Sequence, residues 1–500
     1  MPTSTDKLKQ IAAGVDNERR YALLWPVLVI EIALGVVLGL RSTSSPQAYD
    51  THTYAVQALQ LASGDGSWLA TGAHNYLYPA FLAVLHMLGL WGNSPLPASP
   101  ADVSPLDGRL GVGVVQIALL YAASLFLMAV LSRCLRARLV SIGVVVCGVA
   151  ILPAAAWSGY WLSESLAAPL LLVIIALWVW TCYSVLLRPG SMSTMAIICG
   201  LGLASGSAWM TRPALIWVPA VVGLLLGLMI LASTLWLRTR HHDLSVPPPS
   251  YLRAVGLIAA FLFGAALSLV PQLAFDSSIA DAFKLNLAGQ QAQGSSTIWR
   301  YATNVSGCGS PGLAFSPLST DVAPMLSGQI QAPSSPVWWL TTAAAHLVSG
   351  WDPLPSPNYA TSLTLSPWIY ATMVSGFLVA APLLIFSWLV SEMRSLWAGW
   401  RLRAESSVDM SRFAFAASIA GLLVFFGVTQ VELLGTATEF RFNLMGWLSA
   451  GACLVFLIAS GGLSRKRLAL YVSMSVSLSA VILIIGQMTL DYSAYWLACR

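Results

Sequence analysis

Eleven stretches of the chain carry almost no charged residue, and each is about as long as a bilayer is thick. The hydrocarbon core, about 30 Å across, is spanned by about 20 helical residues at 1.5 Å each. Because lipid offers no partner for backbone N–H and C=O groups, a single spanning segment must pair them internally, which predicts a helix for each stretch. The stretches are residues 22–40, 112–131, 139–157, 165–187, 193–210, 214–237, 254–275, 368–390, 413–431, 442–463 and 468–490.

The composition agrees with a chain that lies mostly in lipid. Of its 500 residues, 57% are hydrophobic and only 9% are Asp, Glu, Lys or Arg, whereas soluble domains carry about 25% charged residues. A water-soluble enzyme is excluded because its surface would need far more polar side chains. Intrinsic disorder is excluded because it requires low hydrophobicity and high charge. We therefore predict an all-α polytopic membrane protein. Its partners would include membrane lipids but no nucleic acid.

A shorter apolar segment, residues 76–91, decides the topology. The positive-inside rule keeps Lys and Arg on the cytoplasmic side of a membrane. If the segment does not cross, 18 of the 25 basic residues are cytoplasmic and 7 are outside; if it crosses, the numbers become 10 and 15. We expect residues 76–91 to form a helix on the outer face of the inner (plasma) membrane. The N-terminus is then cytoplasmic and the C-terminus periplasmic.

Two predicted outer regions are long enough to carry function. The first, residues 41–110, holds the 76–91 helix and a second short helix at 50–63. The other, residues 276–367, is rich in Ser, Gly and Pro, and loops longer than about 15 residues are usually functional or disordered. The predicted division is a transmembrane core with a catalytic first outer loop (1–275), a long periplasmic loop that binds acceptor or donor (276–367), and C-terminal transmembrane helices (368–500).

Two carboxylates are predicted at the outer boundary, each among aromatic residues. Asp50 lies just outside the first span, and Glu164 lies between the third and fourth spans. Asp50 would also serve as a helix N-cap, and Glu164 would interact favourably with a helix N-terminus. Acids on one face can also perform acid/base chemistry or hold a divalent metal. For Glu31, inside the first span, we favour a packing role.

Several basic residues break the positive-inside trend. Snorkelling of a long side chain to lipid headgroups explains each of them, and binding of an outer anionic group such as phosphate is the functional alternative. A local pair with Glu439 is a further explanation for Arg441. His52 shows no metal-ligand spacing with the other outer histidines, which favours a hydrogen-bonded or interfacial role. The basic residues concerned are Arg212, Lys284, Arg300 and Arg441.

Five motifs follow one another along the sequence. They are Asp50 before a Tyr-x-x-x-Ala-x-x-Leu-x-x-Gly helix (54–64), an aromatic-Pro segment (76–79), a second acid (Glu164), a Gly-rich span ending in Thr-Arg (202–212), and a Glu-x-Arg-aromatic turn (439–442). Their order is similar to that of the GT-C superfamily of integral-membrane glycosyltransferases. The branch it resembles most contains the lipid A aminoarabinose transferases and protein O-mannosyltransferases, and the likeness covers roughly residues 22–237 and a late turn. Thr51 stands where many relatives have a second acid.

The resemblance implies a reaction on the outer face. A sugar would move, with inversion, from an undecaprenyl-phosphate-type polyprenyl donor to a glycan, lipid or protein acceptor of the cell envelope. Asp50 would take the acceptor proton and Glu164 would assist or orient the acceptor, while basic residues stabilise the leaving phosphate. The resemblance names no certain cofactor and leaves a divalent metal open. It assigns donor-phosphate binding to Arg212, Arg441, Lys284 and Arg300, and substrate binding to Tyr54, His52, Tyr78 and Glu439.

Two other classes compete with this interpretation. A flippase or transporter of lipid-linked sugars tends to carry ionisable groups in mid-membrane and two related halves, whereas this sequence has its unusual charges at the outer boundary and no visible internal symmetry. An O-antigen polymerase or ligase uses outer arginines and a large outer loop but is not expected to begin with an acid-bearing first loop. The sequence leaves open the sugar, the acceptor, the oligomeric state, and whether Cys308 and Cys499 form a disulfide.

Overall fold

The computed structural model describes twelve parts of the chain, and within them it contains helices and no strands. The parts are residue 22 and residues 24–43, 49–65, 75–91, 109–187, 191–212, 215–239, 251–280, 365–401, 407–435, 444–459 and 469–481.

Each of the eleven predicted stretches contains a helix. Eight helices, α2, α5, α8, α9, α10, α11, α16 and α17, are long and apolar enough to cross a membrane. The predicted class, an all-helical polytopic membrane protein, is therefore confirmed. The bounds are α2 (Leu24–Thr43), α5 (Arg109–Leu135), α6 (Leu139–Val145), the π-helical η2 (Val146–Ile151), α7 (Leu152–Trp157), α8 (Ser163–Leu187), α9 (Met192–Thr211), α10 (Trp217–Thr239), α11 (Tyr251–Ala280), α16 (Leu365–Arg401), α17 (Ser407–Gly435), α18 (Leu444–Ala459) and Ala469–Val481.

The number of eleven crossings stays a prediction. The third stretch forms α6, η2 and α7, so a π-helical turn interrupts it and neither α-helical piece is long enough to span. Within the described parts, the last two stretches hold two shorter helices. These are α18, of 16 residues, and Ala469–Val481.

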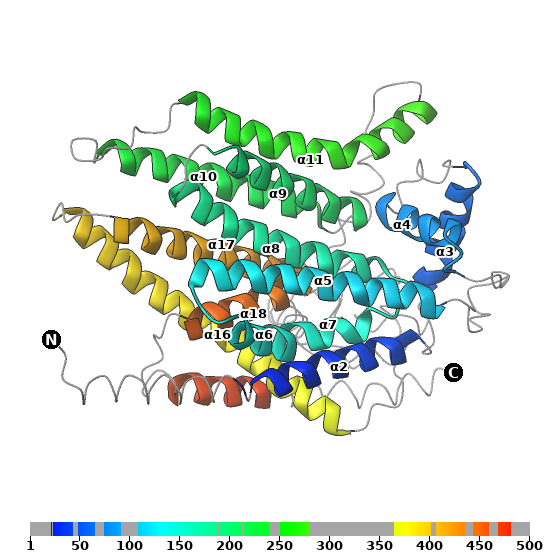
Figure 1. Ribbon diagram of the computed structural model, residues 1–500, viewed down its shortest axis with the longest axis horizontal. Coiled ribbons are helices and arrows are strands. Elements are labelled where there is room, and N and C mark those ends of the chain that lie inside the picture. Colours follow the sequence, from blue (N-terminus) through cyan, green and yellow to red (C-terminus); the bar gives the residue numbers. More distant parts are fainter. Residues whose placement is uncertain are drawn as a thin grey trace, which may run out of the picture.

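Successive helices run in alternating directions, and α3 (Tyr49–Ala62) and α4 (Leu77–Met87) lie together at one end of the bundle (Figure 1). We call this the α3/α4 end. The two helices contact each other through Tyr54 and Tyr78, whose ring centroids are 4.9 Å apart. The 76–91 segment thus starts and finishes at one end of the bundle, as expected of a helix that does not cross.

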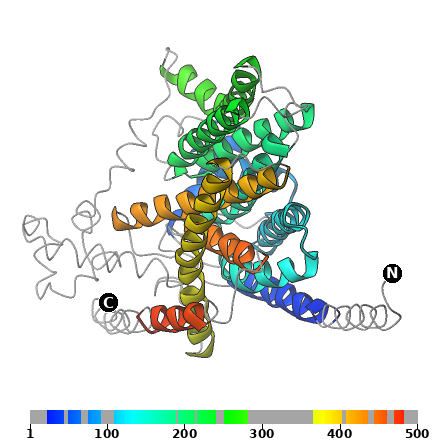
Figure 2. The same cartoon turned by 90° about the vertical axis from the view of Figure 1, so that its left-hand side faces the viewer.

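Helix α8 is the centre of the bundle, whereas α2 and α11 lie on opposite margins of it in both views (Figures 1 and 2). In its most apolar window 72% of α8 is buried, against 17% for α2 and 22% for α11. Trp178 of α8 is fully buried, and its indole N–H donates to the Ser418 carbonyl of α17 at 3.3 Å. The two marginal helices therefore bury far fewer of their residues than α8 does.

Helices α9 and α11 approach each other closely because glycines face one another. A Cβ atom added to Gly202 of α9 would lie 2.0 Å from the Phe261 carbonyl oxygen, and one added to Gly264 of α11 would lie 2.0 Å from that of Cys199. Small residues allow such backbone contact between membrane helices, where packing replaces the hydrophobic effect as the driving force. This contact fixes the course of α9 up to its end at Thr211.

The glycine contact predicts different effects for two substitutions on α9. Gly202→Ala should lower stability by about 1–3 kcal/mol, because the added methyl group overpacks the α11 contact. Gly200→Ala is the matched control, since a Cβ atom there meets only a Leu177 methyl group at 3.8 Å. Thermal unfolding of the two purified variants in detergent measures the difference. Equal melting temperatures for the two variants would show that α9 and α11 are not in close contact.

Candidate active site

Two residues singled out in the sequence form a buried ion pair at the α3/α4 end. Arg212 Nη1 lies 3.0 Å from Glu164 Oε1, and the side chains are 12% and 5% exposed. The Ser163 hydroxyl donates to Glu164 Oε2 at 3.2 Å. A buried charge is costly unless it is paired and hydrogen-bonded. Each of the two residues therefore makes the burial of the other tolerable.

Local sequence explains why each partner sits at a helix end. Glu164 belongs to the first turn of α8, where a negative charge interacts favourably with the helix N-terminus. Arg212 precedes Pro213, and a residue before proline avoids the helical region. Arg212 accordingly adopts an extended backbone, with φ −145° and ψ 120°, so α9 ends at Thr211. The Arg212 side chain thereby leaves the helix beside the start of α8.

The turn that precedes α8, residues 158–162, is where the first-loop helices attach. The Thr51 hydroxyl of α3 donates to the Trp161 carbonyl at 3.2 Å. Beyond the end of α4, the Trp91 ring packs edge-on against the Trp161 ring, with centroids 4.7 Å apart. The end of α2 joins them, because the Gly159 N–H donates to the Ser42 hydroxyl at 3.0 Å. The 158–162 turn therefore joins three separate helices directly before Glu164.

Two buried residues, Tyr78 and Gln116, support the same turn through hydrogen bonds. The Gln116 amide satisfies its neighbours when its oxygen accepts from the Tyr78 hydroxyl (2.9 Å) and its nitrogen donates to the carbonyls of Ser158 (2.7 Å) and Tyr160 (3.3 Å), and we assign that orientation. Burial raises the pKa of Tyr78 well above its ordinary value, and nearby Tyr54 and Glu164 raise the pKa further. The phenol therefore stays protonated and acts as a donor.

The structure brings Asp50 into this neighbourhood through its backbone. Asp50 belongs to α3 and directly precedes Thr51, which contacts Trp161, three residues before Glu164. The side chain of Asp50 itself is outside the described part of the structure, as is that of His52. The role of Asp50 as a general base stays a prediction. Outside the described residues altogether lie Lys284, Arg300, Glu439, Arg441, Cys308, Cys499 and the part of the long loop from 281 to 364.

Tyr54 and Tyr78 are placed as supports of the α3–α4 pair. Tyr54 is 5% exposed and Tyr78 is fully buried. Their rings meet edge to face at 84°, a geometry that stabilises aromatic pairs by about 0.5–1.5 kcal/mol beyond burial. Direct contact of either ring with a substrate stays a prediction.

The described side chains offer no metal site. Among them, no three His, Cys, Asp or Glu residues come close enough together to hold a metal ion. Glu164, the carboxylate of the described cluster, is already engaged by a guanidinium group. A divalent metal at this site therefore stays untested.

Three buried polar residues of this region escaped sequence analysis. Asn75, Gln116 and Gln272 are at most 1% exposed. Gln116 and Gln272 each lie inside an apolar stretch, and Asn75 directly precedes the 76–91 segment. A scan for charged residues alone passes over them. The signal that could have found them is an uncharged polar side chain in a span, which must find a hydrogen-bond partner away from water.

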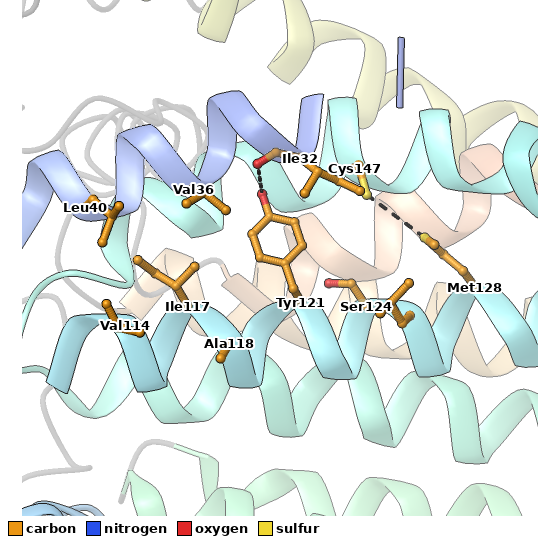
Figure 3. Close-up of a pocket in the computed structure, with 11 residues that line it drawn as sticks. Ile32, Val36, Leu40, Val114, Ile117, Ala118, Tyr121, Ser124, Met128 and Cys147 are labelled. Atoms are coloured by element: carbon orange, nitrogen blue, oxygen red, sulfur yellow. Dashed lines mark hydrogen bonds between the residues drawn. The ribbon is translucent and has the colours of Figure 1, made fainter. Parts of the chain in front are cut away.

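An apolar groove of about 500 Å³ runs between α2 and α5, lined on the α2 side by Val36 and on the α5 side by Ile117 (Figure 3). Its hydroxyl groups are turned onto backbone, since Tyr121 donates to the Ile32 carbonyl at 3.1 Å and Ser124 to that of Leu120 at 2.7 Å. No residue that lines it belongs to the ion pair or to the 158–162 turn. The groove offers hydrocarbon surface and no catalytic group.

Comparison with known proteins gives two weak structural likenesses. Neither a protein-family model nor a curated protein sequence matches the chain. The chain is similar to the oligosaccharyltransferase of Archaeoglobus fulgidus in its apo form (12% identity) and to the AglB oligosaccharyltransferase of that archaeon in complex with an inhibitory peptide and a dolichol-phosphate (11% identity), each with a TM-score of 0.40. Each match covers 93% of this chain and 56% of the archaeal one. A likeness at this level settles neither family nor activity.

The ion pair predicts strong coupling between its two residues. Glu164→Gln or Arg212→Met alone should destabilise the protein by about 3–5 kcal/mol, because each removes one partner of a buried ion pair. The double variant should lose clearly less than the sum of the two, since the interaction between the two charges is lost only once. A double-mutant cycle of thermal unfolding measures the coupling. Additive losses would mean that the two side chains do not interact.

Proposed function

We propose that this chain is an integral-membrane glycosyltransferase that moves a sugar from a polyprenyl-phosphate donor to a cell-envelope acceptor. The observation that carries the proposal is the buried Glu164–Arg212 pair at the α3/α4 end, beside the helix that begins with Tyr49 and Asp50. A cation and an acid from separate parts of the chain thus lie at one end of the bundle. Phosphate binding and proton transfer need such groups together.

Arg212 is the proposed binding group for the donor phosphate. A guanidinium group stays charged at every physiological pH and presents planar N–H donors that match phosphate oxygens. When the bond from the sugar to the donor phosphate breaks, its electron pair stays on the phosphate oxygen, and a pre-placed cation stabilises that charge. Glu164 then acts as a positioning residue, because its carboxylate orients the guanidinium.

Asp50 is the proposed general base. The acceptor hydroxyl oxygen attacks the anomeric carbon as the Asp50 carboxylate takes its proton, and the donor phosphate departs from the opposite side, which inverts the anomeric centre. Thr51 anchors the first turn of α3 to the 158–162 turn, which supports a fixed position for its neighbour. Lys284, Arg300 and Arg441 are proposed to assist with the phosphate, and His52 and Glu439 to contact the substrates.

Basic residues support the proposed orientation, with the α3/α4 end outside the cytoplasm. At the described helix ends and short turns, the two ends of the bundle differ sharply in the number of basic residues. The positive-inside rule assigns the more basic end to the cytoplasm. That end holds Arg133, Arg136, Arg138, Arg238, Arg253, Arg394, Arg401 and Arg412, and the α3/α4 end holds Arg41, Arg109 and Arg212.

The proposal is tested by offering labelled polyprenyl-phosphate sugars and an envelope extract to the purified protein in liposomes. A glycosyltransferase forms a new glycosidic bond, whereas a flippase only moves the intact label across the bilayer. A polymerase or ligase would transfer glycan from a diphosphate-linked donor instead. Transport without transfer would overturn the proposed activity.

Asp50→Asn should lower the transfer rate by about 10²–10⁴-fold, the usual contribution of a general base. Asp65→Asn is the matched control, since Asp65 is an exposed acid just beyond the same helix. Initial rates at saturating donor, together with melting temperatures, separate catalysis from folding. A fully active Asp50→Asn enzyme would remove Asp50 from the mechanism.

Arg212→Lys should raise the donor KM about tenfold and leave the acceptor KM nearly unchanged. Lysine retains the charge opposite Glu164 but lacks the planar fork that binds phosphate oxygens. Arg41→Lys, at an exposed position on the same end of the bundle, is the control. Equal increases in both KM values would assign Arg212 a structural role.

A further inference from the structure

The junction of residues 75 and 76 joins three helices that are far apart in the sequence. The Asn75 side-chain amide donates to the Trp209 carbonyl in the last turn of α9. The Tyr76 N–H donates to Gln272 Oε1 of α11 at 3.1 Å, and its hydroxyl donates to the Ser268 carbonyl at 2.9 Å. Helix ends carry backbone groups without intrahelical partners. The junction therefore provides hydrogen-bond partners for backbone groups at the start of α4 and at the end of α9.

The acceptor of Asn75 is the carbonyl group at which Arg212 departs from α9. The Arg212 N–H is 3.1 Å from that same Trp209 oxygen, and also 3.1 Å from the Ala208 oxygen. The Trp209 carbonyl oxygen therefore accepts hydrogen bonds from both the Asn75 side-chain amide and the Arg212 backbone N–H. Asn75 is 1% exposed, so water cannot easily replace its hydrogen bond.

The rest of α4 leads to the other partner of the ion pair. Tyr78 reaches the 158–162 turn through Gln116, and Trp91, just beyond the helix, packs on Trp161. One helix of 11 residues thus contacts both the end of α9, which carries Arg212, and the turn that leads into Glu164. The segment around α4 is thus in contact with the neighbourhoods of both charged residues.

We infer that Asn75 is a positioning residue for Arg212, which it places for the donor phosphate by capping the last turn of α9. This inference rests on the proposed function. Asn75 makes no contact with the reacting atoms in this scheme. It acts through the Trp209 carbonyl, and its loss lets the Arg212 backbone shift relative to Glu164.

The test compares binding of a polyprenyl phosphate with binding of the matching uncharged polyprenol, using the full chain in nanodiscs. Wild-type protein should prefer the phosphate, and Asn75→Leu should reduce that preference about tenfold while polyprenol binding stays unchanged. Tyr76→Phe is the matched control, because it removes a hydrogen bond of the same junction to α11 instead of α9. It should keep the wild-type preference. If the leucine variant does not fold, Asn75→Ala adds no bulk and serves in its place.

The outcomes separate this inference from the function on which it rests. If Arg212→Ala loses the phosphate preference but Asn75→Leu retains it, the positioning role is wrong and the proposed donor site stands. If Tyr76→Phe loses the preference as fully as Asn75→Leu, the junction acts only through stability, and the inference is again wrong. If wild-type protein shows no preference for the phosphate, the proposed function fails and the inference with it.

Discussion

The burial of two opposite charges between the start of α8 and the end of α9 constrains the rest of the α3/α4 end of the molecule. In a chain with so few charged residues, neither Glu164 nor Arg212 could be kept away from water alone. The pair therefore requires the start of α8 and the end of α9 to lie side by side. The close glycine packing of α9 on α11 and the central place of α8 hold the two helices in that register. Among the described elements, α2, α3 and the segment around α4 are attached at one of these two points.

Within the part of the chain that the structure describes, these attachments come from short elements. Helix α3 is fixed to the 158–162 turn by Thr51, and α4 is fixed at one end to α9 and α11 and at the other to Trp161. A site built in this way has its geometry set by buried hydrogen bonds and aromatic packing. Such a scaffold suits a reaction that depends on the placement of a few charged groups, as the proposed sugar transfer does.

Local chemistry made most of the fold predictable. An uncharged run must be helical in lipid, so the stretch 165–187 anticipates α8 at Ser163–Leu187. The structure places α4 of the 76–91 segment at one end of the bundle, while the outer-face position that the positive-inside rule gives this segment stays a prediction. The Glu164–Arg212 contact was not predicted, because no local rule links two helix ends so distant in the sequence. Gln116 and Asn75 were missed because the scan weighed charge and not hydrogen bonding. The π-helical turn at Val146–Ile151 had no signal that we recognised.

The protonated phenol of Tyr78 gives the supporting hydrogen bonds a fixed sense. Proton donation runs from Tyr78 to the Gln116 oxygen and from the Gln116 nitrogen to the carbonyls of the turn. Folding favours the neutral phenol because burial raises its pKa, so its contribution is constant at every pH below the ordinary tyrosine value of about 10. A change of pH within the physiological range therefore does not reverse the direction of these hydrogen bonds. These hydrogen bonds join a phenol, an amide and backbone carbonyls, and none of these groups titrates across the physiological range.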